Sequence, residues 1–345
     1  MKTIVKVLCL LLLMCFTYAC SKDDDKTEPV AVEEPVTDVF AVGYESDGTK
    51  DIAKMWKNGV ATSLTDGENR TTANSLFVSG NDVYVVGSGT NGVEDIGMVW
   101  KNGVPIKLTQ RLRSYANSVF VSESNVFVIG NIYNGATSTA VVWKNEESMN
   151  LFDGIEGIDL YSIFVVQNDI YVAGAQYNGH VNVAKIWKNG VPTNLTDGTT
   201  HAVVNSIFIQ GTDVYAVGYE NNENDISIAK IWKNGKGTSL TKGIDYATAN
   251  SVYAVGSDVY VAGTDYSNGK SMATIWKNNS PLKLTNGVYP SYATSIFVQG
   301  TDVYVSGYVY TGPSYVAKTW KNGEVTNLTD GTYKAYANAV FVTSQ

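Results

Sequence analysis

The sequence predicts an all-β fold: a seven-bladed β-propeller with four antiparallel strands in each blade. Three observations support this prediction: a tryptophan motif that recurs seven times, two further motifs that keep step with it, and β-rich segments separated by short turn signals. The seven tryptophans are 43 to 45 residues apart, at Trp56, Trp100, Trp143, Trp187, Trp232, Trp276 and Trp320. Four strands of about six residues and four connections of about five fill such a period.

The two accompanying motifs give the order of the strands within one repeat. One motif is a triplet such as Asp82-Val83-Tyr84, and the other resembles Asn74-Ser75-Leu76-Phe77. In this repeat we expect strands at residues 73–78, 82–86, 95–101 and 104–108. A turn signal about every ten residues, together with many β-branched and aromatic residues, excludes helical repeats of similar length. We expect each tryptophan to pack between neighbouring blades, where a large ring buries much area.

The two ends of the repeat region predict how the ring closes. The chain ends in a first-strand motif at residues 337–343, whereas the repeats begin with a second-strand motif at Asp38-Val39-Phe40. The C-terminal strand should therefore complete the first blade, which leaves no open edge at the axis.

The N-terminus predicts export. Lys2 and Lys6 precede an apolar stretch at residues 7–16 that is too short to span a bilayer, and Ala19-Cys20 follows. This arrangement resembles a bacterial lipoprotein signal, which implies cleavage after residue 19 and a lipid on Cys20. The acidic run after Ser21 resembles the surface-export signal of some Gram-negative lipoproteins.

These features divide the chain into three parts and predict its location. We expect a signal peptide at residues 1–19, a lipid-anchored flexible tether at 20–37 and the propeller at 38–345. The resemblance implies a protein anchored to the bacterial outer membrane and displayed on the surface, with a membrane contact through the lipid. Over residues 38–345 the chain resembles bacterial propeller lipoproteins generally, and it matches no propeller family of known activity.

Composition excludes several kinds of function. The net charge of −8 becomes about −10 without the signal peptide, so a nucleic-acid partner is excluded. All three cysteines lie in the first 20 residues, and the two histidines, His180 and His201, make no metal-binding pattern. The glycine-rich run at 87–92 joins two strands and opens no helix, so it is no dinucleotide site. We therefore expect no cofactor, no metal and a monomer.

One face of the propeller carries the variation among repeats. With strands A to D numbered from the axis outward, the A–B and C–D turns are short and uniform, whereas the B–C and D–A loops vary. Variable loops on a rigid frame are the usual place for binding. The only arginines of the chain, Arg70, Arg111 and Arg113, fall in two adjacent D–A loops, where their guanidinium groups suit carboxylate or phosphate. Local salt bridges of Arg70 with Asp66 or Glu68 are the alternative use.

Tyrosines crowd the same predicted loops. A tyrosine offers a flat apolar ring and a polar tip, which suit sugar or peptide surfaces, although it is also a good strand former. From this set we single out Tyr115, Tyr292 and Tyr336, together with Asp159, an acid near the axis. The full set is Tyr44, Tyr115, Tyr133, Tyr177, Tyr219, Tyr246, Tyr266, Tyr289, Tyr292, Tyr308, Tyr310, Tyr333 and Tyr336.

The sequence leaves three hypotheses for function. The first is a surface module that binds a glycan, peptide or protein through the B–C/D–A face. The second is a polysaccharide-active enzyme that uses loop carboxylates, for which Asp153, Glu156 and Asp159 are candidates. The third is a structural envelope protein. No catalytic residue can be assigned, because propellers support unrelated functions.

Overall fold

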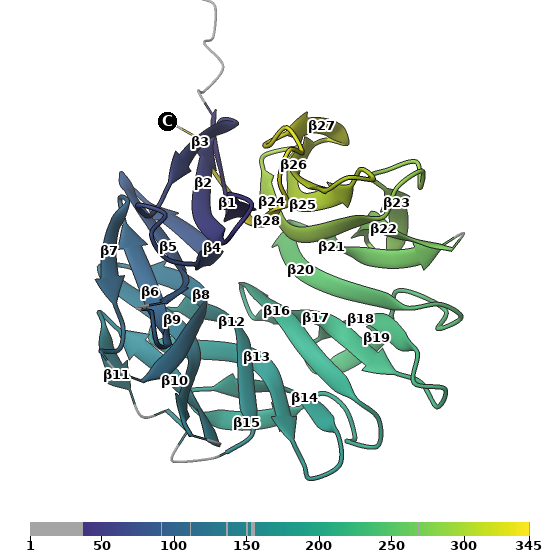
Figure 1. The fold of residues 1–345 in the computed structure, drawn as a ribbon. Coiled ribbons are helices and arrows are strands. Elements are labelled where there is room, and N and C mark those ends of the chain that lie inside the picture. The colour runs from purple at the N-terminus through teal and green to yellow at the C-terminus, as the bar shows by residue number, and fades with distance from the viewer. Residues whose placement is uncertain are drawn as a thin grey trace, which may run out of the picture. The chain divides into compact units, whose positions relative to one another are not determined.

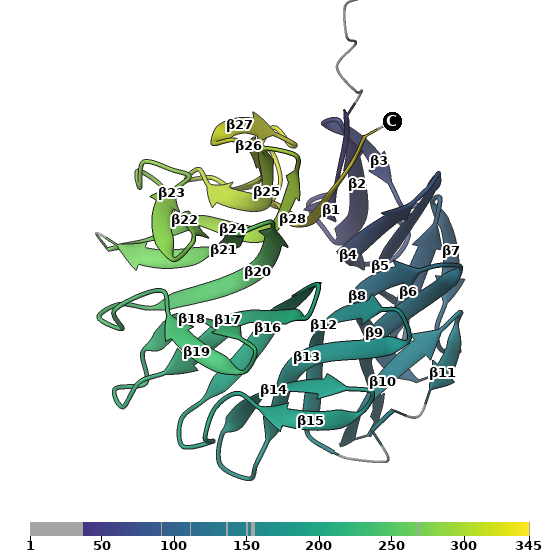
Figure 2. The same ribbon diagram turned by 180° about the vertical axis from the view of Figure 1, so that it is seen from behind.

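The computed structural model describes residues 37–90, 92–110, 112–135, 137–149, 151–152, 156–267 and 269–344. These residues form seven four-stranded antiparallel sheets, arranged as blades around one axis (Figures 1 and 2). The predicted all-β propeller is therefore confirmed. The expected signal peptide and nearly all of the tether, including Cys20, lie outside the described residues. No helix in the described part of the chain has the length and apolarity needed to cross a membrane.

Each blade contains one strand of each class, from the axis to the rim. The A strands are β28 (Ala335–Ser344), β4 (Thr71–Ser79), β8 (Arg113–Ser122), β12 (Ile158–Val166), β16 (Ala202–Gln210), β20 (Ala247–Val255) and β24 (Ser291–Gln299). The B strands are β1 (Thr37–Ser46), β5 (Asp82–Thr90), β9 (Asn125–Asn134), β13 (Asp169–Tyr177), β17 (Asp213–Asn221), β21 (Asp258–Ser267) and β25 (Asp302–Tyr310).

The outer two strands of each blade are shorter. The C strands are β2 (Asp51–Lys57), β6 (Asp95–Lys101), β10 (Thr137–Lys144), β14 (Asn182–Lys188), β18 (Ser227–Lys233), β22 (Lys270–Lys277) and β26 (Tyr315–Lys321). The D strands are β3 (Val60–Ser63), β7 (Val104–Lys107), β11 (Glu147–Met149), β15 (Val191–Asn194), β19 (Lys236–Ser239), β23 (Ser280–Lys283) and β27 (Glu324–Asn327).

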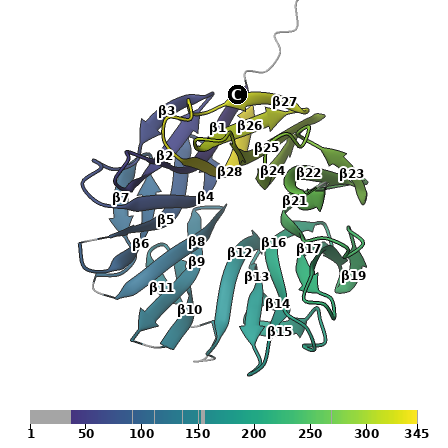
Figure 3. The same cartoon turned by 45° about the vertical axis from the view of Figure 1, so that its right-hand side comes forward.

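The two ends of the propeller meet in the first blade, as the sequence predicts. Strand β28 pairs with β1 along its length, with Phe341 opposite Phe40 and Tyr336 opposite Tyr44. Figures 1 and 3 show this yellow strand beside the purple one. The first blade is thus built from one C-terminal strand and three N-terminal strands, and the ring closes through main-chain hydrogen bonds.

A β-bulge interrupts every A strand at the same place. In β4, Ala73 pairs with Gly87 and Ser75 with Val86, so Asn74 is the extra residue. The bulge directs the carbonyl of Thr72 at Gly87, where a Cβ atom would lie only 1.9 Å from that oxygen. The corresponding glycines of the seven blades, whose Cβ atoms would lie 1.8 to 2.1 Å from the facing carbonyl, are Gly43, Gly87, Gly130, Gly174, Gly218, Gly263 and Gly307.

The bulge makes the A and B strands longer than the sequence predicts. Strand β5 runs to Thr90, whereas we expected it to end at residue 86. The prediction was wrong because Gly87 and Gly89 suggest a loop, while Gly87 in fact accommodates the bulge within the ladder. The glycines at 87 and 89 therefore lie in a strand and open no helix, in agreement with the rejected dinucleotide motif.

The bulged side chains join neighbouring blades. Asn74 Nδ2 donates to the carbonyl of Ala116 in the next A strand at 2.9 Å. Asn338 donates to the carbonyl of Ala73 at 2.8 Å, so the same contact spans the junction between the first and second blades. The remaining donors of this kind are Asn117, Asn205, Asn250 and Thr294. These six bonds tie neighbouring inner strands together around the axis; β12, which has Tyr161 at its bulge, shows no such bond to β16 among the described residues.

A closed ring of aromatic side chains surrounds the axis, three residues after the bulge in each A strand. Phe77 and Phe120 have ring centroids 4.8 Å apart, and the last member, Phe341, lies 5.0 Å from Phe77. Every contact in the ring falls between 4.6 and 5.2 Å, within the range of favourable aromatic pairs. Its members are Phe77, Phe120, Phe164, Phe208, Tyr253, Phe297 and Phe341.

The tryptophans pack between blades, as predicted. All seven side chains are at most 2% exposed. Trp100 of the second blade shares a cluster with Phe40, Val42 and Leu64 of the first blade. Burial of each ring against the preceding blade supplies apolar contact at every interface.

The aspartate and lysine motifs meet on the A–B and C–D face. Lys101 Nζ lies 2.8 Å from Asp82 Oδ2, and Asn102 Nδ2 donates to the other oxygen of Asp82 at 2.8 Å. Asn102 Oδ1 also accepts the N–H of Val83 at 2.8 Å, which fixes the C–D hairpin against the B strand. The repeated motifs on this face therefore have a structural role.

We predict that Gly218→Ala lowers the free energy of unfolding by at least about 2 kcal/mol, because the new Cβ would meet the carbonyl of Val203. Gly97→Ala is the matched control, since a Cβ there would approach no atom closer than 3.4 Å. Urea unfolding followed by circular dichroism measures both. Equal stability of the two variants would contradict the role of the bulge.

Candidate functional site

Four of the singled-out side chains occupy one equivalent place in their blades. We call it the pre-bulge position, two residues before the bulge in the A strand, at the end of the strand that adjoins the D–A loop. Tyr115, Asp159, Tyr292 and Tyr336 hold it in four blades. The complete set is Thr72, Tyr115, Asp159, Val203, Thr248, Tyr292 and Tyr336. The bulge thus brings these residues to one end of the propeller axis.

Tyrosines of the seventh and first blades form a continuous cluster. The ring of Tyr308 stacks on Tyr292 with centroids 4.8 Å apart and meets Tyr336 edge-on at 4.6 Å. Tyr336 continues to its cross-strand partner Tyr44 at 4.9 Å. We define the tyrosine cluster as Tyr44, Tyr292, Tyr308, Tyr310, Tyr315 and Tyr336.

A cavity of about 310 Å³ adjoins this cluster between the sixth and seventh blades. Tyr292 and Tyr308 form one wall, and Tyr246 and Tyr266 lie on the other. The polar side chains around it are hydroxyls and one amide, from Thr248, Asn250, Thr264, Ser271 and Thr294. No charged side chain lines the cavity in the described part of the chain, so its chemistry is aromatic and neutral.

Burial raises the pKa of three hydroxyls in the cluster, those of Tyr44, Tyr308 and Tyr336. Burial, reinforced by Tyr336 and Asp51 and opposed by Arg70, raises the pKa of Tyr44 to about 12. Burial and the neighbouring tyrosines raise the pKa of Tyr308 well above its ordinary value. Neutral phenols both donate and accept hydrogen bonds, and their rings offer apolar faces.

A separate polar group surrounds Arg113. Its Nε and one terminal nitrogen donate to the hydroxyl of Tyr115 at 3.0 and 2.7 Å, and that hydroxyl donates to Asp95 at 2.6 Å. The guanidinium also lies 5.4 Å from the ring centroids of Tyr115 and Tyr133. Arg113 is the first residue of β8 and not part of a loop, which corrects our prediction because the strand starts earlier than the motif suggests.

The other arginines are not brought into this group. Arg70 lies in the D–A loop after the first blade, and its exposed side chain forms no ion pair among the described residues. The salt bridge expected with Asp66 or Glu68 is therefore wrong; Asp66 instead accepts the N–H of Glu68 at 3.0 Å. Arg111 lies outside the described residues.

Most of the tyrosines assigned to variable loops lie instead at strand ends. Tyr44, Tyr292 and Tyr308 belong to β1, β24 and β25. The prediction was wrong because the bulge extends the A and B strands toward the B–C/D–A face. Tyr308 is central to the cluster, yet no sequence pattern separates it from the other tyrosines. Its register opposite Tyr292 is the missing signal.

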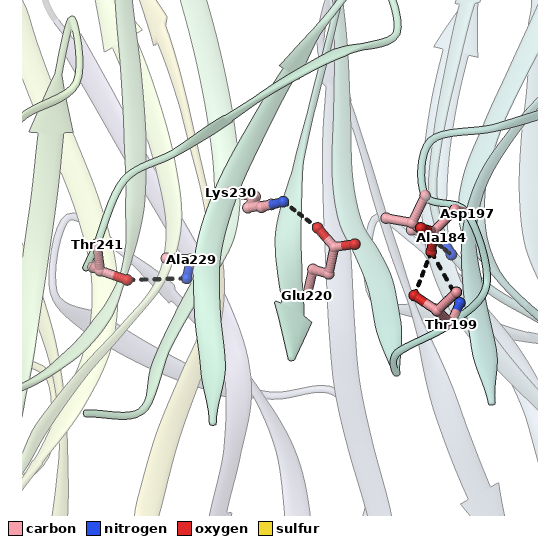
Figure 4. A network of polar contacts seen from close by, with 8 residues as sticks. Ala184, Asp197, Thr199, Glu220, Ala229, Lys230 and Thr241 are labelled. Atoms are coloured by element: carbon pink, nitrogen blue, oxygen red, sulfur yellow. Dashed lines mark hydrogen bonds and ion pairs between the residues drawn. The ribbon is translucent and has the colours of Figure 1, made fainter. Parts of the chain in front are cut away.

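Local hydrogen bonds hold the D–A loops that follow the fourth and fifth blades. Figure 4 shows Asp197 accepting the N–H and hydroxyl of Thr199, at 2.9 and 2.7 Å, and Thr241 Oγ1 accepting the N–H of Ala229 at 3.2 Å. Lys230 of β18 and Glu220 of β17 form an ion pair within the fifth blade. These contacts hold the D–A loops at the B–C/D–A face in place.

Among the described residues, no second carboxyl group contributes to the electrostatics of Asp159. Burial alone raises its pKa. Glycosidases generally place two carboxyl groups about 5 to 9.5 Å apart. Glu156 is exposed in the preceding loop, and Asp153 lies outside the described residues.

The histidines form no metal centre. His201 Nδ1 accepts the N–H of Asn182 at 3.4 Å, and its ring lies 6.0 Å from that of Tyr219. No group of three His, Cys, Asp or Glu side chains among the described residues is placed to hold a metal ion.

Comparison with known proteins supports the propeller fold alone. No family model and no curated protein matches the chain. It is similar to the β-propeller domain of the Trilobed protease from Pyrococcus furiosus, with 13% identity, 85% of this chain and 95% of that chain covered, and a TM-score of 0.53. TolB from Acinetobacter baumannii gives 10% identity and a TM-score of 0.48, covering 72% of this chain and 64% of that chain.

The closure of the ring distinguishes the chain from the first of these structures. The Pyrococcus domain is described as having an open velcro topology. In this protein β28 pairs with β1, so the first blade is completed by the C-terminus.

We predict that Asp159→Asn raises the melting temperature at neutral pH. Burial raises the carboxyl pKa in the folded state, so ionisation above that pKa destabilises the wild-type fold relative to the unfolded chain. The gain should shrink as pH falls through the folded pKa and vanish below the unfolded one. Calorimetry across this pH range measures it; a pH-independent difference would contradict the assignment.

Proposed function

We propose that this protein is a carbohydrate-binding propeller that takes a neutral glycan at the tyrosine cluster and its adjoining cavity. The observation that carries the proposal is the unbroken contact from Tyr292 through Tyr308 to Tyr336 beside a cavity with no charged lining residue. Sugar rings present apolar C–H faces and hydroxyl edges, which match tyrosine rings and hydroxyls.

The composition of the cavity favours a neutral sugar over an acidic one. Thr248, Asn250 and Ser271 supply donors and acceptors that pair with sugar hydroxyls. An acidic sugar would lose hydration of its carboxylate there without gaining a cation. Arg70 and Arg113 lie outside the cavity lining.

The frame supports binding with little reorganisation. Tyr292, Tyr308 and Tyr336 are strand residues within paired ladders, and their rings already contact one another. A site built on strands holds its geometry better than one built on loops. Side chains ordered before binding also reduce the entropy lost when the ligand binds.

The proposal includes the location expected from the N-terminus. The short apolar stretch, Ala19-Cys20 and the acidic run after Ser21 support a lipid on Cys20 and display at the outer-membrane surface. Thr37, where β1 begins, adjoins the A–B face.

We predict that Tyr292→Ala and Tyr336→Ala each weaken binding of a neutral glycan at least about tenfold, or about 1.4 kcal/mol, through loss of ring contact. Ligands come from an array of neutral and acidic polysaccharides, and calorimetry gives the affinities.

Tyr177→Ala is the matched control, because Tyr177 is 54% exposed, lies outside the cluster and bonds only locally, to the carbonyl of Gly179. The proposal fails if only acidic glycans bind, or if the two cluster variants bind as well as the control.

We predict that Cys20→Ser abolishes incorporation of labelled palmitate and releases the protein from the membrane fraction, since no acyl chain would then anchor it. Cys15→Ser is the control and should retain the label. Protease treatment of intact cells tests surface display, which requires loss of the wild-type protein without lysis.

A further inference from the structure

The sixth blade has a cavity on each side at the B–C/D–A face. The inner cavity is the one of about 310 Å³ beside the tyrosine cluster, toward the seventh blade. The outer cavity, of about 340 Å³, lies between the D–A loop at residues 240–245 and the sixth blade, and reaches Pro281 of the D strand β23. Ligand pockets commonly measure about 300 to 1,000 Å³, so each cavity suits one small unit of a ligand.

Strand β21 places the two cavities on opposite sides of its sheet. Tyr260 and Ala262 pack with the seventh blade, whereas Val261 packs with the fifth. Side chains continue to alternate toward the end of the strand, where Thr264 lines the inner cavity and Asp265 lines the outer one. The end of the sixth blade therefore stands between the cavities.

Tyr266 lines both cavities. Its side chain is 36% exposed, and its N–H donates to the carbonyl of Tyr246 at 2.9 Å. Tyr246 lines the inner cavity and is 60% exposed, and Ile244, which lines the outer cavity, is 73% exposed. Exposed apolar side chains therefore stand at both cavities and at the wall that the cavities share.

The chemistry of the outer cavity also suits a neutral sugar. Trp276 supplies an aromatic surface, and Lys242 and Asp245 supply groups that donate to or accept from hydroxyls. Asp265 forms an ion pair with Lys283. These four charged side chains carry no net charge together, so they do not select a charged unit.

The loop that forms one side of the outer cavity is already held in place. Thr241 Oγ1 accepts the N–H of Ala229 at 3.2 Å, and Asn222 Nδ2 donates to the carbonyl of Gly243 at 3.0 Å. A ligand that enters the cavity therefore meets an ordered loop, and little conformational entropy is lost on binding.

We propose that the two cavities are adjoining subsites for one neutral oligosaccharide chain, which crosses the end of the sixth blade over Tyr266. This inference rests on the proposed function and deepens it, because the ligand becomes a chain of at least two linked sugar units. A unit held in the inner cavity keeps the next unit close to the outer cavity, so the second contact forms at a high effective concentration.

The affinity for the ligand should therefore rise with chain length. The probes are single sugars and oligosaccharides of up to six units from starch, cellulose and mannan, titrated into the purified protein by calorimetry. In a series that binds, the longer chains should bind at least about tenfold more tightly than the single sugar.

The outcomes separate the two proposals. If a series binds and Tyr292→Ala weakens it, but affinity does not change with chain length, the inference is overturned and the proposed function stands. If none of the probes binds, the proposed function fails, and this inference fails with it.

Ile244→Ser tests the outer subsite alone, because Ile244 lines only the outer cavity. The variant should weaken the longest chains about fivefold and leave the single sugar unchanged. Val288→Ser is the matched control, since Val288 is the equivalent residue of the next D–A loop, is 53% exposed and lines neither cavity. Equal affinities of the two variants for long chains would exclude the outer cavity.

Tyr266→Ala tests the shared wall. It should remove most of the gain in affinity with chain length, whereas Tyr292→Ala, which alters the inner cavity alone, should weaken chains of every length. A folded Tyr266→Ala protein that keeps the whole gain would overturn the inference.

Discussion

The bulge in each A strand, with a glycine opposite it, is the constraint on which the rest of this propeller depends. The extra residue turns a carbonyl toward the B strand, where only a residue without a Cβ atom fits. The same bulge frees a side chain such as Asn74 to bond the neighbouring blade. It also extends both inner strands toward the B–C/D–A face and brings the pre-bulge side chains together there.

The two faces of the propeller differ in how uniform their residues are: one has the same hydrogen bonds in every blade, and the other varies from blade to blade. On the A–B and C–D face, Asn102 and its equivalents pin each hairpin, and lysine–aspartate pairs accompany them. The third blade has Asn125 where others have aspartate, and Asn145 still bonds it at 3.0 Å. Since exposed ion pairs contribute little, the asparagine hydrogen bonds hold this face. At the opposite end the pre-bulge residue changes from blade to blade without disturbing the ladder.

That freedom allows two kinds of chemistry around one axis. The seventh and first blades present tyrosine rings in contact with one another, whereas the fourth places the half-buried carboxylate of Asp159 at the pre-bulge position. Both sets of side chains project from strands whose register the bulge fixes. The recognition that we propose depends on residue identity at equivalent positions of a rigid frame, and not on loops that must order when a ligand binds.

The sequence by itself determined the blade number, the strand order and the closure by the C-terminus, because a period of 43 to 45 residues and a divided first repeat leave few alternatives. It also predicted the burial of the tryptophans, since large rings repeated in a β motif pack between neighbouring blades.

The strand lengths and the tyrosine cluster could not be predicted from the sequence. Gly87 suggests a loop by composition alone, and only the bulge shows why it stands within a strand. The contact of Tyr308 with Tyr292 and Tyr336, and the isolation of Asp159, depend on register and on which blades become neighbours, which only the tertiary structure decided.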